Sequence, residues 1–240
     1  MPVSLKDRVA LVVGASSGIG RACATMLAAE GAKVMASARR ADLLSDLKKQ
    51  MAGQAFEVCA ADATRAADME RLAAETQRSL GPVNLLVYAT GTNTPDRALT
   101  RLRPEIWDEM VATNLNGAFY ITHALLPAMR EARDGHLIFI SSISGHTPDV
   151  SGAAYQASKR GVIGLAHAIR VEERENGIRT TVINPGLVDT PLLAKRPTKT
   201  SADQLAKAML PEHVAEVVLS CARLPARAVI TELSVVPTAI

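Results

Sequence analysis

The chain has 240 residues, of which 48% are hydrophobic, which suits one large α/β domain or two small ones. Its 27 Lys and Arg residues nearly balance 24 Asp and Glu residues, and only 3% of residues are aromatic. The basic residues are scattered, so the sequence lacks the charged blocks and stacking residues of a nucleic-acid-binding protein.

The N-terminal residues lack the long apolar core of a signal peptide, and no stretch approaches the roughly 20 apolar residues that span a bilayer. We therefore expect a cytoplasmic protein with no membrane partner. No linker, low-complexity tract or repeat divides the chain, so we expect a single domain over residues 1–240. The cysteines Cys23, Cys59 and Cys221 are far apart in apolar surroundings, which predicts small buried side chains instead of disulfides or a metal site.

The first predicted strand, 8–13, is a nearly continuous apolar run, typical of a strand buried on both faces of a parallel sheet. It leads through the turn Gly14-Ala15-Ser16-Ser17-Gly18-Ile19-Gly20 into a predicted helix, 21–30. Glycines let a pyrophosphate approach the backbone, and the free N–H groups of the helix attract it. The turn alone leaves the nucleotide open, because flavin, methyl-donor and sugar-nucleotide proteins carry comparable turns.

The second predicted strand, 33–37, is followed by Ala38, Arg39 and Arg40. In a dinucleotide fold this position faces the adenosine ribose, where a carboxylate holds a 2′-hydroxyl and an arginine holds a 2′-phosphate. The missing carboxylate and the two arginines favour NADP. The alternative is that both arginines are ordinary surface residues that open the next helix, 42–51.

The third predicted strand, 55–60, is followed by Asp62, Ala63 and Thr64. Asp62 could accept a hydrogen bond from an adenine amino group. An Asp or Thr here could equally cap the helix predicted at 66–80, and both interpretations can hold together.

The fourth predicted strand, 84–89, ends at Thr90 and Gly91, and a long helix is predicted over 104–132. That helix carries Asn114 among apolar residues. An asparagine inside a helix competes for backbone hydrogen bonds, so we expect something to compensate for it.

The fifth predicted strand, 136–140, leads into several serines that include Ser142. Serines at the carboxyl end of a parallel strand point into the crevice where open α/β sheets bind ligands. The segment from Ser142 to Tyr155 contains two glycines and a proline besides, so we expect a loop that folds back over this crevice.

A helix predicted over 155–175 begins with Tyr155 and Lys159, which share one face because they are four residues apart. A positive neighbour favours the phenolate, so we expect Lys159 to lower the pKa of Tyr155 and make it a proton donor and acceptor. The alternative is a core tyrosine and a solvated lysine.

The remaining predicted elements are a strand at 178–183, a helix at 211–223 and a last strand within 228–236. Seven strands that alternate with helices predict a doubly wound (Rossmann) parallel sheet of the α/β class with helices on both faces. Residues 191–200 are the only candidate for a loose excursion from this sheet.

Taken together, these motifs resemble the short-chain dehydrogenase/reductase family over the whole chain, in the same order and at the same spacings. They are the glycine turn, the Asp62 motif, Asn114, Ser142, the pair Tyr155 and Lys159, and Pro185-Gly186 with Val188 and Thr190. The resemblance implies an NADP-dependent oxidoreductase that acts on a carbonyl or secondary alcohol.

The resemblance also implies residue roles. Tyr155 would be the general acid in reduction and the general base in oxidation, and Ser142 would hydrogen-bond the substrate oxygen. Lys159 would hold the nicotinamide ribose, and Asn114 would fix a water in a proton relay. NADP(H) would be bound by Gly14, Ser16, Ser17, Gly18, Ile19, Gly20, Arg39, Arg40, Asp62, Ala63, Ala89, Gly91, Tyr155, Lys159, Pro185, Gly186, Val188 and Thr190.

Two segments of this chain differ from other members of the family in their residues. Tyr88-Ala89-Thr90 replaces the family's Asn-Asn-Ala, so two amides that would brace the sheet beneath the cofactor are missing. The residues 191–210, a substrate lid in the family, carry Lys195, Arg196 and Lys199, which indicate either an anionic substrate or a solvated lid surface. His146, Ser144, Leu187, Leu192 and Leu193 are expected to line the substrate pocket.

Two functions from different classes remain open at this stage. The first is the NADP(H)-dependent enzyme, with no metal, acting as a homodimer or homotetramer on a small molecule. The second is an NADP(H)-binding regulator or scaffold without significant turnover. The intact set Asn114, Ser142, Tyr155 and Lys159 favours the enzyme, because a regulator needs the glycine turn but not all four.

Overall fold

In the computed structural model, which describes residues 3–239, seven parallel strands form one sheet with the order β3-β2-β1-β4-β5-β6-β7. They are β1 (Val9–Val13), β2 (Lys33–Ala38), β3 (Phe56–Ala60), β4 (Leu85–Tyr88), β5 (Gly135–Ile140), β6 (Ile178–Pro185) and β7 (Glu232–Val235). Because β1 pairs with both β2 and β4, the strand order reverses there, and the predicted doubly wound sheet is confirmed. Residues 1–2 and 240, the ends of the predicted domain, lie outside the described part.

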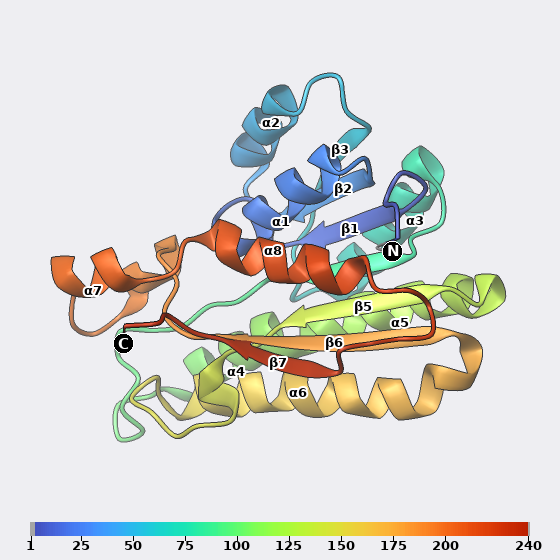
Figure 1. The fold of residues 1–240 in the computed structure, drawn as a ribbon. Helices are drawn as coiled ribbons and strands as arrows, with labels where there is room; N and C mark the ends of the chain where they lie inside the picture. The colour runs from blue at the N-terminus through green and yellow to red at the C-terminus, as the bar shows by residue number, and fades with distance from the viewer. Residues whose placement is uncertain (1–2, 240) are drawn as a thin grey trace.

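The helices cover both faces of this sheet (Figure 1). One apolar cluster joins the sheet to α1, α2 and α8, and a second joins it to α3, α5 and α6. Every residue of β1, β5 and β6 is buried, which explains the apolar runs of β1 and β5. β6 is buried although it includes polar residues such as Arg179 and Asn184. The helices are α1 (Gly18–Ala29), α2 (Ala41–Gln50), α3 (Ala66–Leu80), α4 (Pro104–Val111), α5 (Gly117–Ala132), α6 (Ala153–Glu173), α7 (Ala202–Lys207) and α8 (Pro211–Ala222). No helix within residues 3–239 is long and apolar enough to cross a bilayer.

The helix predicted over 104–132 is interrupted. A π-helical segment, Ala112–Asn116, separates α4 from α5, whereas Pro127 lies inside α5 without ending it. The π-helical hydrogen-bond pattern widens the turn, and such segments are frequent at functional sites. The periodicity of apolar residues did not predict this interruption, because one inserted residue leaves the flanking patterns nearly intact.

The chain after β6 is more ordered than predicted. A 3₁₀ turn, Pro191–Lys195, lies within the predicted excursion, and the short helix α7 follows it. Ser201 caps α7 through reciprocal hydrogen bonds with Gln204. Val188 pairs with Met209, so the two ends of this segment meet. We call residues 191–210 the lid. The last strand is shorter than the predicted 228–236 and covers only Glu232–Val235.

Candidate active site

The glycine turn after β1 is closely packed against the end of β4. Gly14 has φ +97°, and a Cβ there would lie 2.8 Å from the Ala89 carbonyl carbon and the Thr90 nitrogen. A Cβ on Gly20 would collide with the Gly14 carbonyl oxygen. Ser17 stands before α1 without a side-chain capping bond, so the first N–H groups of α1 stay free. The turn therefore forms a concave backbone surface that is open only because these residues have no side chains. This surface and the free N–H groups fit a pyrophosphate.

The loop after β6 meets this turn. A Cβ on Gly18 would lie 3.1 Å from Cγ2 of Thr190. Thr190 precedes the 3₁₀ turn that begins at Pro191, but its side chain makes no capping bond. The Thr190 hydroxyl therefore makes no hydrogen bond within residues 3–239 and lies beside the glycine turn.

The two arginines after β2 differ in their contacts. Nη2 of Arg40 donates to Oγ of Ser16 at 2.7 Å and to Oγ of Ser17 at 2.8 Å, and its Nε donates to Ser16 at 3.2 Å. Arg39 is exposed and makes no side-chain hydrogen bond or ion pair within residues 3–239. Arg40 is thus held against the glycine turn, and no carboxylate within residues 3–239 forms an ion pair with it.

Asp62 does not cap α3, because the residue at that cap is Arg65. Instead Oδ1 of Asp62 accepts from the backbone N–H of Thr64 at 3.0 Å and from its hydroxyl at 2.9 Å. The helix-cap alternative is therefore wrong, and Asp62 stabilises the turn that follows β3. Its contact with adenine stays a prediction.

Asn114 lies in the π-helical segment and is completely buried. Its Oδ1 accepts from the Thr92 N–H at 2.8 Å, and its Nδ2 donates to the Thr92 carbonyl at 3.1 Å and to Oγ of Ser158 at 2.9 Å. Ser158 in turn donates to the carbonyl of Tyr155 at 2.8 Å. These bonds are the expected compensation, and they connect the segment after β4 to α6. Thr92 and Ser158 were missed because nothing local to either residue marks it as a partner of Asn114.

Tyr88 takes over a structural role at the position where the family has an amide. Its Oη donates to the carbonyl of Thr113 at 2.6 Å, and the side chain is fully buried, which raises its pKa. Gly117 leaves the space for this ring, because a Cβ there would collide with Oη. A phenol thus ties β4 to the π-helical segment that carries Asn114.

Tyr155 and Lys159 lie on successive turns of α6, with Nζ of Lys159 5.8 Å from the centroid of the Tyr155 ring. Only 4% of Lys159 is exposed, so the alternative of a solvated lysine is wrong. Nζ donates to the Ile140 carbonyl at 2.9 Å. A Cβ on Gly91 would lie 3.4 Å from Nζ and 3.8 Å from Oδ1 of Asn114, so Gly91 allows these two groups to approach the same space.

The prediction that Lys159 lowers the pKa of Tyr155 is wrong in this structure. Burial raises the pKa of the Tyr155 phenol above its usual value, although a hydrogen bond with Ser142 and the nearby charges of Arg97 and Arg196 act in the opposite direction. Burial also lowers the pKa of Lys159 to about 8. Desolvation is the largest cause of the pKa shift in both groups, and neither shift includes a contribution from the other group.

Ser142 begins a hydrogen-bonded chain of side chains. Its Oγ accepts from the Ser144 N–H and donates to Oγ of Ser144, both at 3.2 Å. Ser144 donates to Oδ2 of Asp149 at 2.6 Å, and Ser151 donates to the other oxygen of that carboxylate. Burial raises the pKa of Asp149, but these hydrogen bonds outweigh it and hold the pKa below its usual value. The chain orients Ser142, and its partner Asp149 was not anticipated from the sequence.

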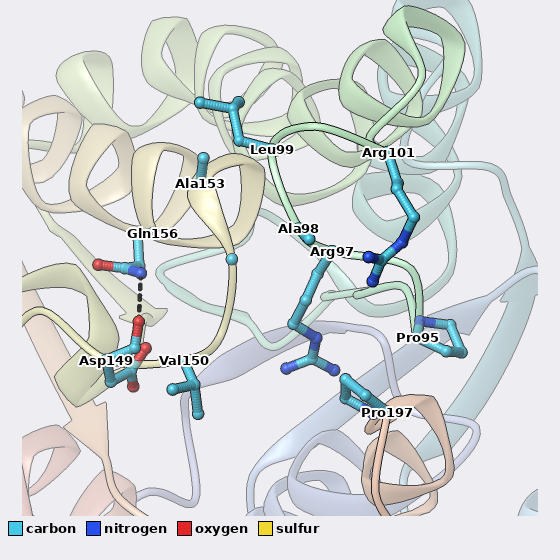
Figure 2. A pocket seen from close by; sticks show the side chains of 11 residues that line it. Pro95, Arg97, Ala98, Leu99, Arg101, Asp149, Val150, Ala153, Gln156 and Pro197 are labelled. Atoms are coloured by element: carbon cyan, nitrogen blue, oxygen red, sulfur yellow. Dashed lines mark hydrogen bonds between the residues drawn. The ribbon is translucent and has the colours of Figure 1, made fainter.

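Of the residues expected in the substrate pocket, His146 is turned away. Its Nε2 contacts Glu232 of β7 and lies 3.0 Å from Nδ2 of Asn184. A cavity of about 580 Å³ lies instead between the loop after β4, the segment before α6 and the lid. Figure 2 shows residues of its lining, among them Arg97, Asp149, Gln156 and Pro197. Gly152 also lines the cavity. Gly152 and Gln156 stand on either side of Tyr155 in the sequence.

Comparisons with known proteins agree with this geometry. A family model described as short chain dehydrogenase matches residues 8–201. An uncharacterized oxidoreductase from Staphylococcus aureus (strain MRSA252) is 34% identical over 233 residues, which cover 97% of this chain and 98% of the relative. The closed form of a serine dehydrogenase complexed with NADP⁺ has a TM-score of 0.88 at 30% identity, covering 95% of this chain and 94% of that one. An actinorhodin polyketide ketoreductase with NADPH has a TM-score of 0.88 at 31% identity, covering 98% of each.

Proposed function

This chain belongs to the short-chain dehydrogenase family and is an oxidoreductase, and we propose that it transfers hydride between NADP(H) and a carbonyl or secondary-alcohol group. The observation that carries this proposal is the buried assembly at the carboxyl edge of the sheet. Tyr155, Lys159 and Asn114 approach one another there, and Ser142 faces them from the end of β5. A protein that only bound the cofactor would not need all four.

The choice of NADP over NAD rests on Arg40. Its guanidinium is held on Ser16 and Ser17, next to the turn that fits the pyrophosphate, and Ala38 supplies no carboxylate that would repel a 2′-phosphate. The NADP-bound structures that this chain resembles support the same choice. Ile19, Asp62, Ala63, Ala89, Pro185, Gly186, Val188 and Thr190 complete the proposed cofactor site.

In the proposed reduction, the bound nicotinamide supplies the hydride that reaches the carbonyl carbon. The Tyr155 phenol donates its proton to the carbonyl oxygen. The Ser142 hydroxyl would turn its proton from Ser144 to the same oxygen and donate a hydrogen bond where negative charge develops. Because burial raises the pKa of Tyr155, the phenol is protonated at neutral pH and suits the role of acid in reduction. In alcohol oxidation the same group would accept the proton.

Lys159 supports the proton transfer. Its pKa of about 8 lies close to neutral pH, so it can release and take up a proton under working conditions. Asn114 and Nζ of Lys159 both approach Gly91. We assign Asn114 a positioning role in the path by which a proton returns to Tyr155.

Purified protein mixed with NADPH and a panel of ketones, ketoacyl thioesters, sugars and quinones tests the proposal by loss of the reduced-nicotinamide absorbance. Turnover that depends on both a carbonyl compound and NADPH supports the enzyme. Tight NADPH binding with no turnover across the panel, or in the reverse direction with alcohols, would support the regulator or scaffold instead.

The proposal includes a homodimer or homotetramer. Trp107 of α4, Phe119 of α5 and Val171 of α6 are large apolar side chains with exposed fractions of 37%, 48% and 56%. Surface residues of this kind on neighbouring helices favour contact between two copies. Light scattering on the eluting protein would measure the mass, and a monomer at micromolar concentration would contradict this part of the proposal.

A further inference from the structure

The cavity lined by Gly152, Gln156 and Pro197 contains a guanidinium group that is fixed but not neutralised. Nε of Arg97 donates to the Thr94 carbonyl at 3.0 Å, and its Nη2 donates to the Lys195 carbonyl in the lid at 2.6 Å. Both acceptors are neutral backbone groups. Nη1 makes no hydrogen bond within residues 3–239. Figure 2 shows the guanidinium extending into the space between Val150 and Pro197.

A second cation, Arg196 of the lid, lies near Arg97. Burial and the like charge of Arg196 both lower the pKa of Arg97, and neither arginine forms an ion pair within residues 3–239. Two partly buried guanidinium groups that repel each other are unfavourable unless an anion lies between or beside them. The charge of Asp149 acts against this lowering, but Asp149 forms no ion pair with Arg97.

The other charged side chains around the cavity form no ion pair with Arg97. Arg101 lines it, but Nε of Arg101 is paired with Asp96 at 2.6 Å on the surface. The carboxylate of Asp149 accepts hydrogen bonds from Ser144 and from both the N–H and the hydroxyl of Ser151. Asp149 moderates the positive charge of the cavity without forming an ion pair with Arg97.

The cationic group is close to the proposed chemistry. A Cβ on Gly152 would lie 2.7 Å from Cβ of Arg97, so Arg97 packs directly against the residue that precedes α6. The charges of Arg97 and Arg196 both reach the phenol of Tyr155. A small molecule whose oxygen lies at Tyr155 could therefore extend another of its groups to Arg97.

We propose that this cavity binds an anionic group of the substrate, a carboxylate or a phosphate monoester, with Arg97 as the principal donor and Arg196 as a second positive charge. The planar fork of a guanidinium matches either oxyanion, and Nη1 is the free side of that fork. Because Arg97 also holds the Lys195 carbonyl, the anion would lie under the lid. This inference rests on the proposed oxidoreductase function and adds the class of its substrate.

The test uses matched ketones with NADPH. Each set contains a keto acid, the methyl ester of the same acid and a keto phosphate monoester. The charge of the phosphate lies at the same distance from the ketone carbonyl as that of the acid. Three sets are made, each with a different chain length. We expect kcat/KM for one anionic member to exceed that for the ester by about tenfold or more, mainly through KM, because hydrogen bonds to charged groups are strong. The better of the two anions identifies the carboxylate or the phosphate.

Three variants assign the preference to Arg97. In Arg97→Gln the ratio of anion to ester should fall to near one, whereas Arg97→Lys, which keeps the charge, should retain part of it. Arg101→Gln is the matched control, since it removes a neighbouring arginine whose charge is already paired, and it should keep the full ratio. A preference for the anion that is partly restored in Arg97→Lys shows that the positive charge binds the anion. It separates this role from the hydrogen bond by which Arg97 holds the Lys195 carbonyl in the lid.

Each outcome decides the question. An ester that is reduced as well as its acid and phosphate, or a ratio that survives in Arg97→Gln, overturns the anion site while leaving the oxidoreductase intact. Absence of turnover with every ketone and every corresponding alcohol rejects the proposed function, and the anion site is rejected with it.

Discussion

Arg40, which follows β2, donates hydrogen bonds of 2.7 and 3.2 Å to Oγ of Ser16 in the turn that follows β1. Because β1 and β2 are neighbouring parallel strands, their carboxyl ends bring the two residues together at one edge of the sheet. A hydroxyl partner orients the guanidinium but leaves its charge available.

Replacing Arg40 should therefore change the choice of cofactor. In Arg40→Gln we expect kcat/KM for NADPH to fall by about tenfold or more, which corresponds to the loss of a hydrogen bond between charged groups, and kcat/KM for NADH to change by less than about twofold. Arg39→Gln is the matched control and should keep the preference for NADPH. An equal loss with both cofactors would show that Arg40 only supports the turn.

Removal of the Tyr155 hydroxyl should abolish chemistry and spare binding. In Tyr155→Phe we expect turnover to fall by about 10²-fold or more, since the phenol supplies the proton in reduction. The affinity for NADPH, measured by fluorescence titration, should change by less than about twofold. Turnover close to that of the unmodified protein would rule out the proposed acid.

Lys159 should lower the stability of the protein at neutral pH. Its pKa falls from 10.5 in the unfolded chain to about 8 in the fold. As the pH drops through this window, the unfolded chain takes up a proton that the folded protein does not. The free energy of unfolding therefore decreases as the pH falls from 10.5 to about 8, by about 3 kcal/mol at most. Below pH 8 this contribution no longer changes.

Lys159→Met should accordingly raise the free energy of unfolding at pH 7. The gain should be about 1 to 3 kcal/mol, less than the full cost of the buried amine, because the Ile140 carbonyl loses its hydrogen-bond donor in the variant. The advantage over the unmodified protein should shrink as the pH rises from 8 to 10.5. Urea unfolding at several pH values measures the difference, with the exposed Lys207→Met as a control. A difference that does not change with pH would contradict the lowered pKa.

Substitutions of Gly14 and Gly53 should show separately the cost of backbone strain and the cost of close packing. Their φ angles are +97° and +89°, but a Cβ on Gly53 would have nothing within 4 Å, whereas one on Gly14 would collide with the chain at Ala89 and Thr90. Gly53→Ala should cost about 1 kcal/mol of stability from its backbone alone. Gly14→Ala should cost clearly more and also weaken NADPH binding, as unfolding and titration would measure. Equal effects of the two substitutions would mean that the turn is not packed as described.

Much of the fold could be predicted from local patterns. Strands such as β1 and β5 are continuous apolar runs because they are buried on both faces, and helices such as α3 show regular apolar spacing. The glycine turn was recognisable because only glycine permits its backbone and its close contacts. These features depend on residues near one another in the sequence, so the sequence alone carries them.

Other features depend on partners that are distant in the sequence. The bonds of Asn114 to Thr92 and Ser158, and the phenol of Tyr88 on Thr113, join segments that meet only when the sheet has formed. The sequence likewise could not distinguish Arg39 from Arg40, since both follow β2 and both are exposed.

The sequence by itself determined the family, the parallel sheet and the identity of the candidate reacting groups, because motif spacing and hydrophobic period are local properties. Only the tertiary structure decided the ionisation of those groups and the charge of the cavity beside them. Burial raises the pKa of Tyr155 and lowers that of Lys159, and folding places Arg97 under the lid. Desolvation and charge proximity are set by the three-dimensional surroundings, which the order of residues does not reveal.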